Sequence, residues 1–392
     1  MFFGPASYRA FLACTVIHSI ATAGAEALLP FYMKSLGTST ALAGLPFIAN
    51  SLARFFSDPF SGAISDRLSS RSFILLSLLL GAGFSLLAGA STKPTLFLSF
   101  WIFIGVSESM FALGIRKVAF ESARPGSEGS TVGNITTLYG IGSVLGPPVA
   151  GYLGSQWGTR VLFLIYALPL FLGIALCWLF PLSSSAKNLQ AYPKKRSLFR
   201  EGRELLYLPA FLAACLGMFF MFFSHWGAMK VALPLFAVEE RGLTLADVGT
   251  ILGIAGVVDI LGRYTGGLSC DRWGARRAIQ WALLISALSF ALVNLAPGYG
   301  GLLASACGMA LGHGFLNVTS TMLALKAAEE NRGGLALGLA RWFGSAGSIS
   351  GPFLIGILAE ALSYGMVFFF LGIFALGLVG WLKLWLLKSL SP

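Results

Sequence analysis

One feature of this sequence constrains its fold more than any other: two motifs each occur twice, 205 residues apart. The first lies at 58–67 and again at 263–272, where an Asp-Arg pair begins four residues after a glycine. The second lies at 142–151 and again at 347–356, in a different apolar segment, and combines three glycines with a proline. Two independent matches at one offset are hard to obtain by chance. The chain is therefore predicted to be a tandem duplication.

The apolar content excludes an ordinary soluble protein. Hydrophobic residues make up 56% of the chain and charged residues only 11%, whereas soluble domains carry about 25% charged residues. A helix needs about 20 apolar residues to cross a bilayer, and each repeat contains six such stretches. They lie at roughly 8–33, 41–64, 71–91, 95–118, 130–154, 160–181, 208–236, 246–269, 276–296, 298–325, 334–358 and 364–388. The sequence predicts an all-α membrane protein with twelve transmembrane helices.

The spacing of the spans also predicts domains and orientation. An even number of spans in each repeat places both halves the same way up in the membrane. The expected domains are an N-terminal six-helix bundle (1–181), a polar and basic linker (182–207) and a C-terminal six-helix bundle (208–392). By the positive-inside rule, both termini and the linker face the cytoplasm. Among the Lys and Arg residues between spans, those on the opposite side are Lys34, Lys93, Arg160 and Arg241.

Several classes of function find no support in the sequence. The net charge of +11 follows from the topology and from anionic lipids, so it needs no nucleic acid partner. The five cysteines lie singly on different spans, so we interpret them as small core residues rather than a disulfide framework or metal cluster. No nucleophile with a base, catalytic metal motif or phosphate-binding loop is present. We expect no cofactor, no bound metal and no enzyme activity.

The first repeated motif resembles the loop signature of the major facilitator superfamily, G-x-x-x-D-R-x-G-R, which follows the second and eighth spans. The resemblance covers the whole chain and implies two parallel six-helix repeats around a central cavity. It also implies that the motif stabilises one conformation of alternating access. The motif residues are Asp58, Gly62, Asp66 and Arg67 in the first copy and Arg263, Gly267, Asp271 and Arg272 in the second. The first copy departs from the pattern at Ser69, where the second has Gly274.

The second repeated motif resembles a fifth-span pattern of proton-coupled antiporters, particularly drug exporters. Glycine allows a neighbouring helix to approach, and proline bends a helix because it donates no backbone hydrogen bond. The residues concerned are Gly142, Gly146, Pro147 and Gly151. The resemblance favours export, although Tyr152 replaces the last glycine of the pattern. Because the eleventh span carries a similar run, the motif can also be only a packing device.

Two i,i+4 pairs of opposite charge occupy equivalent positions in the second and eighth spans. Arg54 precedes Asp58 by one turn, and Asp259 precedes Arg263 by one turn, so each pair lies on one helix face. Partners of this kind offset the cost of charge inside a bilayer. Each pair either neutralises itself or also faces the other across the seam between the halves.

Other ionisable residues inside spans mark a candidate site, because such groups are costly in a membrane. Near the start of each half the offset is 204, because Pro30 pairs with Pro234. Glu26 therefore corresponds to Lys230. Farther along the chain the offset is 205, so Glu108 corresponds to His313. The resemblance implies that these spans line the central cavity, with one acidic and one basic wall. Each group can instead serve as a structural hydrogen bond or permanent ion pair.

The candidate site divides into two sets of residues. Proton coupling is assigned to Glu26 first and to Glu108 second, because a carboxyl in such a cavity can exchange a proton as the cavity opens. The substrate-binding candidates are Lys230, His313, Arg341, Trp226 and Trp342. We interpret His18 and His225 as helix-packing residues.

These observations predict a secondary active transporter that exports a small amphiphilic compound in exchange for protons. The first alternative is proton-coupled transport of an anionic or zwitterionic metabolite or a siderophore, favoured by the basic wall. The second, from another class, is a sensor or enzyme without transport, for which neither a soluble domain nor a catalytic motif provides support. The expected partners are the substrate, protons and the lipid bilayer of a bacterial inner membrane, and we expect a monomer.

Overall fold

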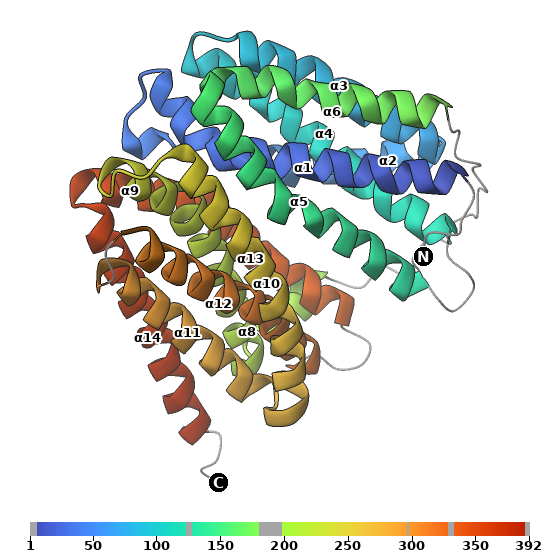
Figure 1. The fold of residues 1–392 in the computed structure, drawn as a ribbon. Coiled ribbons are helices and arrows are strands. Elements are labelled where there is room, and N and C mark those ends of the chain that lie inside the picture. The colour runs from blue at the N-terminus through green and yellow to red at the C-terminus, as the bar shows by residue number, and fades with distance from the viewer. Residues whose placement is uncertain (1–5, 123–127, 180–197, 296–297, 328–332, 389–392) are drawn as a thin grey trace. The chain divides into compact units, whose positions relative to one another are not determined.

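The computed structural model describes residues 6–122, 128–179, 198–295, 298–327 and 333–388. Twelve helical segments of 21 to 31 residues account for most of this described part of the chain (Figure 1). Nine helices within the same ranges are long and apolar enough to cross a membrane. The predicted all-α architecture with twelve long helices is confirmed. Residues 182–197 of the predicted linker lie outside the described residues.

The helices follow the repeat. Those of the first half are α1 (Ala6–Ser35), η1 (Thr40–Leu42), α2 (Leu45–Arg67), α3 (Ser70–Ala90), α4 (Pro94–Ser122), α5 (Glu128–Trp157) and α6 (Thr159–Leu179). A short helix, α7 (Leu198–Leu206), comes next. Those of the second half are α8 (Pro209–Ser224), η2 (His225–Ala232), α9 (Leu233–Glu239), α10 (Leu245–Trp273), α11 (Ala275–Leu295), α12 (Gly298–Ala327), α13 (Gly333–Ala361) and α14 (Tyr364–Lys388).

The chain forms two compact units. Unit 1 comprises Met1–Thr38, Leu45–Ala191 and Thr244–Gly253. Unit 2 comprises Ser39–Gly44, Tyr192–Leu243 and Ile254–Pro392. In unit 1, α1 packs against α5 and α6, while α3 packs against α4 and α6 (Figure 1). The equivalent helices of unit 2 repeat these pairings, because α8 packs against α13 and α11 packs against α12 and α14.

Glycines bring α1 and α5 into backbone contact. A side chain on Gly146 would place its Cβ 2.6 Å from the carbonyl oxygen of Ile20 and 2.7 Å from the amide nitrogen of Gly24. A side chain on Gly24 would in turn meet the carbonyl oxygen of Gly146 at 3.0 Å. The same arrangement occurs in unit 2, where Gly227 lies against the backbone of Gly351. Small residues therefore set the distance between the paired helices.

Two arginines cap the ends of antiparallel helices in unit 1. Arg71, at the start of α3, donates to the carbonyl oxygens of Cys177 and Trp178 at the end of α6, both at 3.2 Å. Arg160, at the start of α6, donates to the carbonyl oxygens at the end of α3, namely those of Gly89 at 3.3 Å and Ala90 at 3.2 Å. Carbonyls in the last turn of a helix lack intrahelical donors, and a cation there is favoured by the helix dipole.

The Arg160 cap gives a prediction for stability. We expect Arg160→Met to lower the free energy of unfolding by about 1 kcal/mol, because two carbonyl oxygens lose a charged donor. For a unit of this size that corresponds to a fall in Tm of about 2–4 °C, measured by a thermal shift assay in detergent. Lys93→Met, which removes an exposed positive charge from the next loop, is the matched control. Equal shifts in the two variants would contradict a capping role.

The first span of the second half contains a π-helix that the sequence did not predict. The segment from His225 to Ala232 connects α8 to α9. A π-helix closes i→i+5 hydrogen bonds, is rare and occurs frequently at functional sites. Two candidate residues, Trp226 and Lys230, lie in this segment together with His225.

Candidate functional site

Glu108 on α4 forms the centre of a buried polar cluster in unit 1. Its side chain is only 4% exposed. Oε2 accepts a hydrogen bond of 2.8 Å from Asn50 Nδ2 on α2. Oε1 is also buried, and the described part of the structure offers it no hydrogen-bond donor. A buried carboxyl oxygen without a donor is uncommon and requires an explanation.

A glycine one turn earlier on α4 explains how Asn50 reaches Glu108. A Cβ on Gly105 would lie 3.2 Å from the Cα of Asn50 and 3.0 Å from the Cβ of Ala53. The absence of a side chain at Gly105 therefore lets α2 approach α4 beside the carboxyl group. Arg54, one turn after Asn50, and Glu26, partly buried on α1, both interact electrostatically with Glu108. The structure thus brings the two predicted proton-coupling residues into one cluster.

Three further polar side chains extend this cluster and were not identified from the sequence. Thr22 Oγ1 lies 3.2 Å from Tyr166 Oη and 3.5 Å from His18 Nδ1. Tyr139 on α5 and Tyr166 on α6 both interact electrostatically with Glu108. His18, which is 3% exposed, stacks on the Phe111 ring at 3.9 Å between centroids. Single Tyr and Thr residues on apolar spans carry no sequence signal that separates them from packing residues.

His313 on α12 is the corresponding buried group in unit 2. Its ring is 2% exposed, and Nε2 hydrogen-bonds to Ser224 Oγ at 2.9 Å. Ser224 Oγ also lies 2.8 Å from the carbonyl oxygen of Phe220 and 3.3 Å from that of Met221. The tautomer of His313 decides whether Ser224 Oγ or His313 Nε2 is the donor of their hydrogen bond, and the second ring nitrogen of His313 is Nδ1. This Nδ1 is buried, and the structure describes no donor that pairs with it.

The π-helix brings His225 against His313. The two rings are nearly perpendicular, at 76°, with centroids 5.3 Å apart. His225 also stacks edge-on against Trp226 at 5.5 Å. From the sequence, His225 was interpreted as a packing residue, and Ser224 carried no signal. Their proximity to His313 depends on the π-helix, which no sequence pattern predicted.

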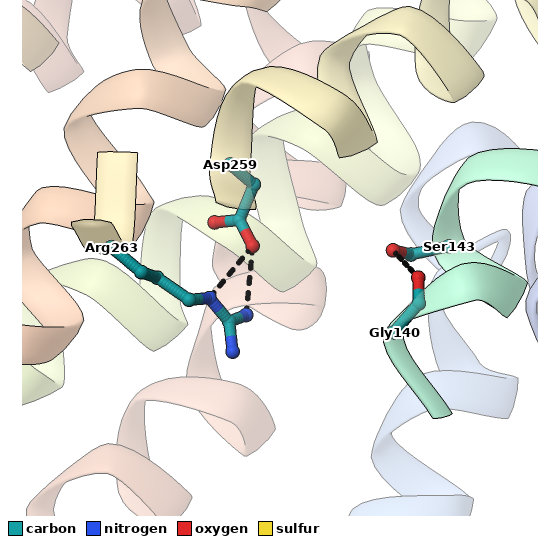
Figure 2. A network of polar contacts seen from close by, with 4 residues as sticks. All are labelled: Gly140, Ser143, Asp259 and Arg263. Carbon is teal, nitrogen blue, oxygen red and sulfur yellow. Dashed lines mark hydrogen bonds and ion pairs between the residues drawn. The ribbon is translucent and has the colours of Figure 1, made fainter. Parts of the chain in front are cut away.

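Charged residues surround this pair of histidines. Arg263 Nε and Nη2 donate to Asp259 Oδ2 at 2.9 Å and 2.8 Å (Figure 2). Lys230 and Arg263 interact electrostatically with His225, and Lys230 also interacts with Asp259. Arg341 and Trp342, by contrast, lie on the exposed surface of α13. The corresponding Asp58 lies on α2, but its side chain is outside the described part of the structure.

The loops that carry the first repeated motif differ in their chemistry. In the second copy, Gly274 adopts a φ of +79° directly after α10, a conformation that favours glycine. In the first copy, Ser69 instead caps α3, and its hydroxyl accepts from the Ser72 amide at 3.2 Å. Asp271 and Arg272 are exposed. The side chains of Asp66 and Arg67, and the surroundings of Gly62, are outside the described part.

The fifth-span motif faces two helices. Gly142 and Gly146 lie against the backbone of α1, whereas Gly151 lies against the backbone of Leu245 at the start of α10. Gly249, one turn later on α10, faces the carbonyl oxygen of Pro147. Pro147 and Pro148 lie within the continuous helix α5. Within unit 1 the motif is therefore a surface for close backbone packing.

The sequence matches the Major Facilitator Superfamily over residues 11–331 and, in a second match, over residues 226–392. The chain belongs to this superfamily. It is therefore an integral, multi-pass membrane protein and a secondary transporter of small molecules, not an enzyme, as the sequence predicted.

Relatives of this superfamily protein include several drug resistance proteins. Multidrug resistance protein 2 of Bacillus subtilis is 23% identical over 91% of this chain and 90% of its own length. Multidrug resistance protein MdtG of Enterobacter lignolyticus is 28% identical, covering 92% and 88% of the two chains. Quinolone resistance protein NorA of Staphylococcus aureus is 21% identical, covering 90% and 89%.

Solved structures of superfamily transporters share the fold. The nucleoside transporter NupG has a TM-score of 0.82 at 14% identity and covers 97% of this chain and 98% of its own. A bacterial homologue of the human lysosomal transporter Spinster has a TM-score of 0.74 at 15% identity, with 97% and 95% coverage. At these identities the likeness shows the fold of the transporter and not its substrate.

Proposed function

We propose that this transporter exports a small amphiphilic compound in exchange for protons, by alternating access of its two halves to a central site. The observation that carries the proposal is Glu108, whose Oε1 is buried without a donor in the described structure. An ionised carboxyl at this position would hold negative charge on an unpaired buried oxygen, at a cost of a few kcal/mol. A proton on Oε1 removes that charge, so Glu108 is suited to carry the proton of the exchange cycle.

Glu26 is proposed as the second proton-coupling group. It interacts electrostatically with Glu108, so a proton on one carboxyl changes the charge that the other experiences. Two coupled carboxyl groups beside Arg54 give the cluster a net charge of −1 when both are ionised. A cationic substrate or a proton can compensate this charge, which provides a physical basis for competition between them.

The direction of transport is supported by two observations. The relatives described above are named as drug resistance proteins. The fifth-span motif, Gly142 to Gly151, also matches the antiporter pattern that predicted export. Export therefore remains the leading proposal.

The alternative substrate class, an anionic or zwitterionic metabolite or siderophore, is favoured by the polar cluster of unit 2. Lys230 and Arg263 carry two positive charges there, whereas Asp259 carries one negative charge. His313 adds a buried ring nitrogen, Nδ1, for which the described structure offers no hydrogen-bond partner. The cluster is thus the charge-inverted counterpart of the cluster around Glu108.

Ligand-dependent thermal stability distinguishes these substrate classes. We expect lipophilic cations to raise the Tm of the detergent-purified protein, because a ligand at 100 times its Kd stabilises the folded state by about 2.7 kcal/mol. The rise should be smaller in Glu26→Gln and in Glu108→Gln, because each variant removes one negative charge from the cluster, and it should persist in full in Lys230→Ala. Stabilisation by anions alone, lost in Lys230→Ala, would instead establish the metabolite alternative.

The remaining assignments complete the proposal. Both termini face the cytoplasm across a bacterial inner membrane, and the protein acts as a monomer. The motif residues Asp66 and Asp271 act as conformational locks, so their replacement by Asn would change the rate of turnover and not substrate preference. Trp226, beside His225, and Trp342, on the exposed surface of α13, are proposed to line the substrate path.

A further inference from the structure

Two of the five cysteines, which the sequence places on different spans, meet inside unit 1. The thiols of Cys14 on α1 and Cys177 on α6 interact electrostatically, and both belong to helices that pack against each other. Their side chains are 1% and 3% exposed, and neither forms a disulfide in this structure. Residues 163 positions apart therefore form a pair of neighbouring thiols that the spacing of the cysteines could not reveal.

A glycine on α6 creates the space for this contact. A Cβ on Gly173 would lie 2.9 Å from Cys14 Sγ, so the sulfur atom occupies the place that a side chain would fill. Cys177 follows Gly173 by one helical turn and lies on the same face of α6. The sulfur of Cys14 is thus held over α6 beside Cys177 by packing.

The pair lies near one end of both helices. Cys14 is in the third turn of α1, and Cys177 is in the last turn of α6, whose carbonyls are capped by Arg71. In the proposed topology this is the cytoplasmic end. Thiols on that side are normally reduced, so a disulfide there is transient and responds to oxidative conditions.

We propose that Cys14 and Cys177 are a redox-modification site, at which a membrane-permeant peroxide or diazene oxidant forms a reversible disulfide between α1 and α6. Each thiol loses one proton and one electron as the two S–H bonds break and the S–S bond forms. A peroxide is reduced to two waters, or a diazene to the corresponding hydrazine, and a dithiol reductant restores both thiols. Because α1 also carries Glu26, the disulfide fixes this helix within unit 1. The proposal is independent of the transported substrate.

The test is oxidation of the purified full-length protein in detergent with diamide, a diazene, followed by denaturation and alkylation of all remaining thiols. We expect the wild type to keep three alkylatable cysteines and to yield one linked peptide pair, Cys14 with Cys177. Cys14→Ser and Cys177→Ser should keep four alkylatable thiols and yield no linked pair, whereas Cys307→Ser should still form it. Oxidised wild type should also melt at a higher temperature than the same sample after dithiothreitol.

A second variant keeps the proposal falsifiable if the cysteine substitutions impair folding. Gly173→Ala retains both thiols but places a Cβ against Cys14 Sγ, so we expect several-fold slower formation of the linked pair. Gly83→Ala on α3 is the matched control, because nothing lies within 4 Å of its Cβ position. Five alkylatable thiols in diamide-treated wild type, or a linked pair that forms equally fast in Gly173→Ala, would overturn the proposal.

Discussion

Glu108→Gln is expected to reduce proton-driven transport to at most about one hundredth of the wild-type rate, the scale on which removal of a proton-transfer group acts. Gln preserves the size of the side chain and can still accept a hydrogen bond from Asn50 Nδ2 through its carbonyl oxygen. It cannot gain or lose the proton that the cycle requires. Substrate exchange without a proton gradient should persist. The measurement is substrate flux in proteoliposomes, with and without an imposed pH gradient.

Two comparisons make the Glu108 result specific. Glu204→Gln removes a carboxyl group from the exposed surface of α7 and should leave both fluxes unchanged. Asn50→Ala removes the donor to Oε2 and should shift the pH dependence of transport without abolishing it. Gradient-driven flux at the wild-type rate in Glu108→Gln would exclude Glu108 as the coupling residue and leave Glu26 as the candidate.

Gly142→Val is expected to have the largest effect on folding. A Cβ on Gly142 would collide with the carbonyl group of Ser19, and it would lie 2.7 Å from the Ser19 Cβ. Backbone atoms on both helices cannot move aside as a flexible side chain can. Overpacking of this kind typically costs about 1–3 kcal/mol, so folded yield and Tm should both fall. Size-exclusion chromatography in detergent and a thermal shift assay measure the two quantities.

The same helix provides the control for Gly142. Gly140 lies two residues earlier on α5, and nothing lies within 4 Å of its Cβ position. Gly140→Val should therefore fold with a yield and Tm close to those of the wild type. If the two variants are equally stable, the contact of α1 with α5 does not depend on the glycine of the motif.

Much of the fold could be predicted because the membrane permits few solutions. Apolar stretches of about 20 residues must form helices, since backbone groups in a bilayer need partners within their own segment. The repeat at 205 residues then indicated which helix of the second half is equivalent to each helix of the first half. The cost of buried charge also directed attention to Glu26, Glu108, Lys230 and His313 without any coordinates.

The remaining parts of the site depend on contacts between helices that hydropathy does not encode. Thr22 and Tyr166 meet across α1 and α6, and Cys14 meets Cys177 across the same pair of helices. Each is a single small or aromatic residue on an apolar span, indistinguishable from lipid-facing or packing residues. His225 was undervalued because its position beside His313 depends on an i→i+5 hydrogen-bond pattern.

The π-helix also changes how the two halves of the chain correspond. Near its start, the contact of Gly227 with Gly351 is equivalent to the contact of Gly24 with Gly146, and Gly24 and Gly227 differ by 203 positions. After it, Pro30 and Pro234 differ by 204. A π-helical turn holds more residues than an α-helical turn, which accounts for the change of the offset by one position within this membrane-spanning segment. Lys230 lies within this stretch and corresponds to Glu26 in the register of Pro30 and Pro234, but to Ala27 in the register of Gly24 and Gly227. The symmetry between the two repeats is broken at this position. A side chain that leaves the helix in a different direction from its equivalent in the other repeat can acquire a role of its own.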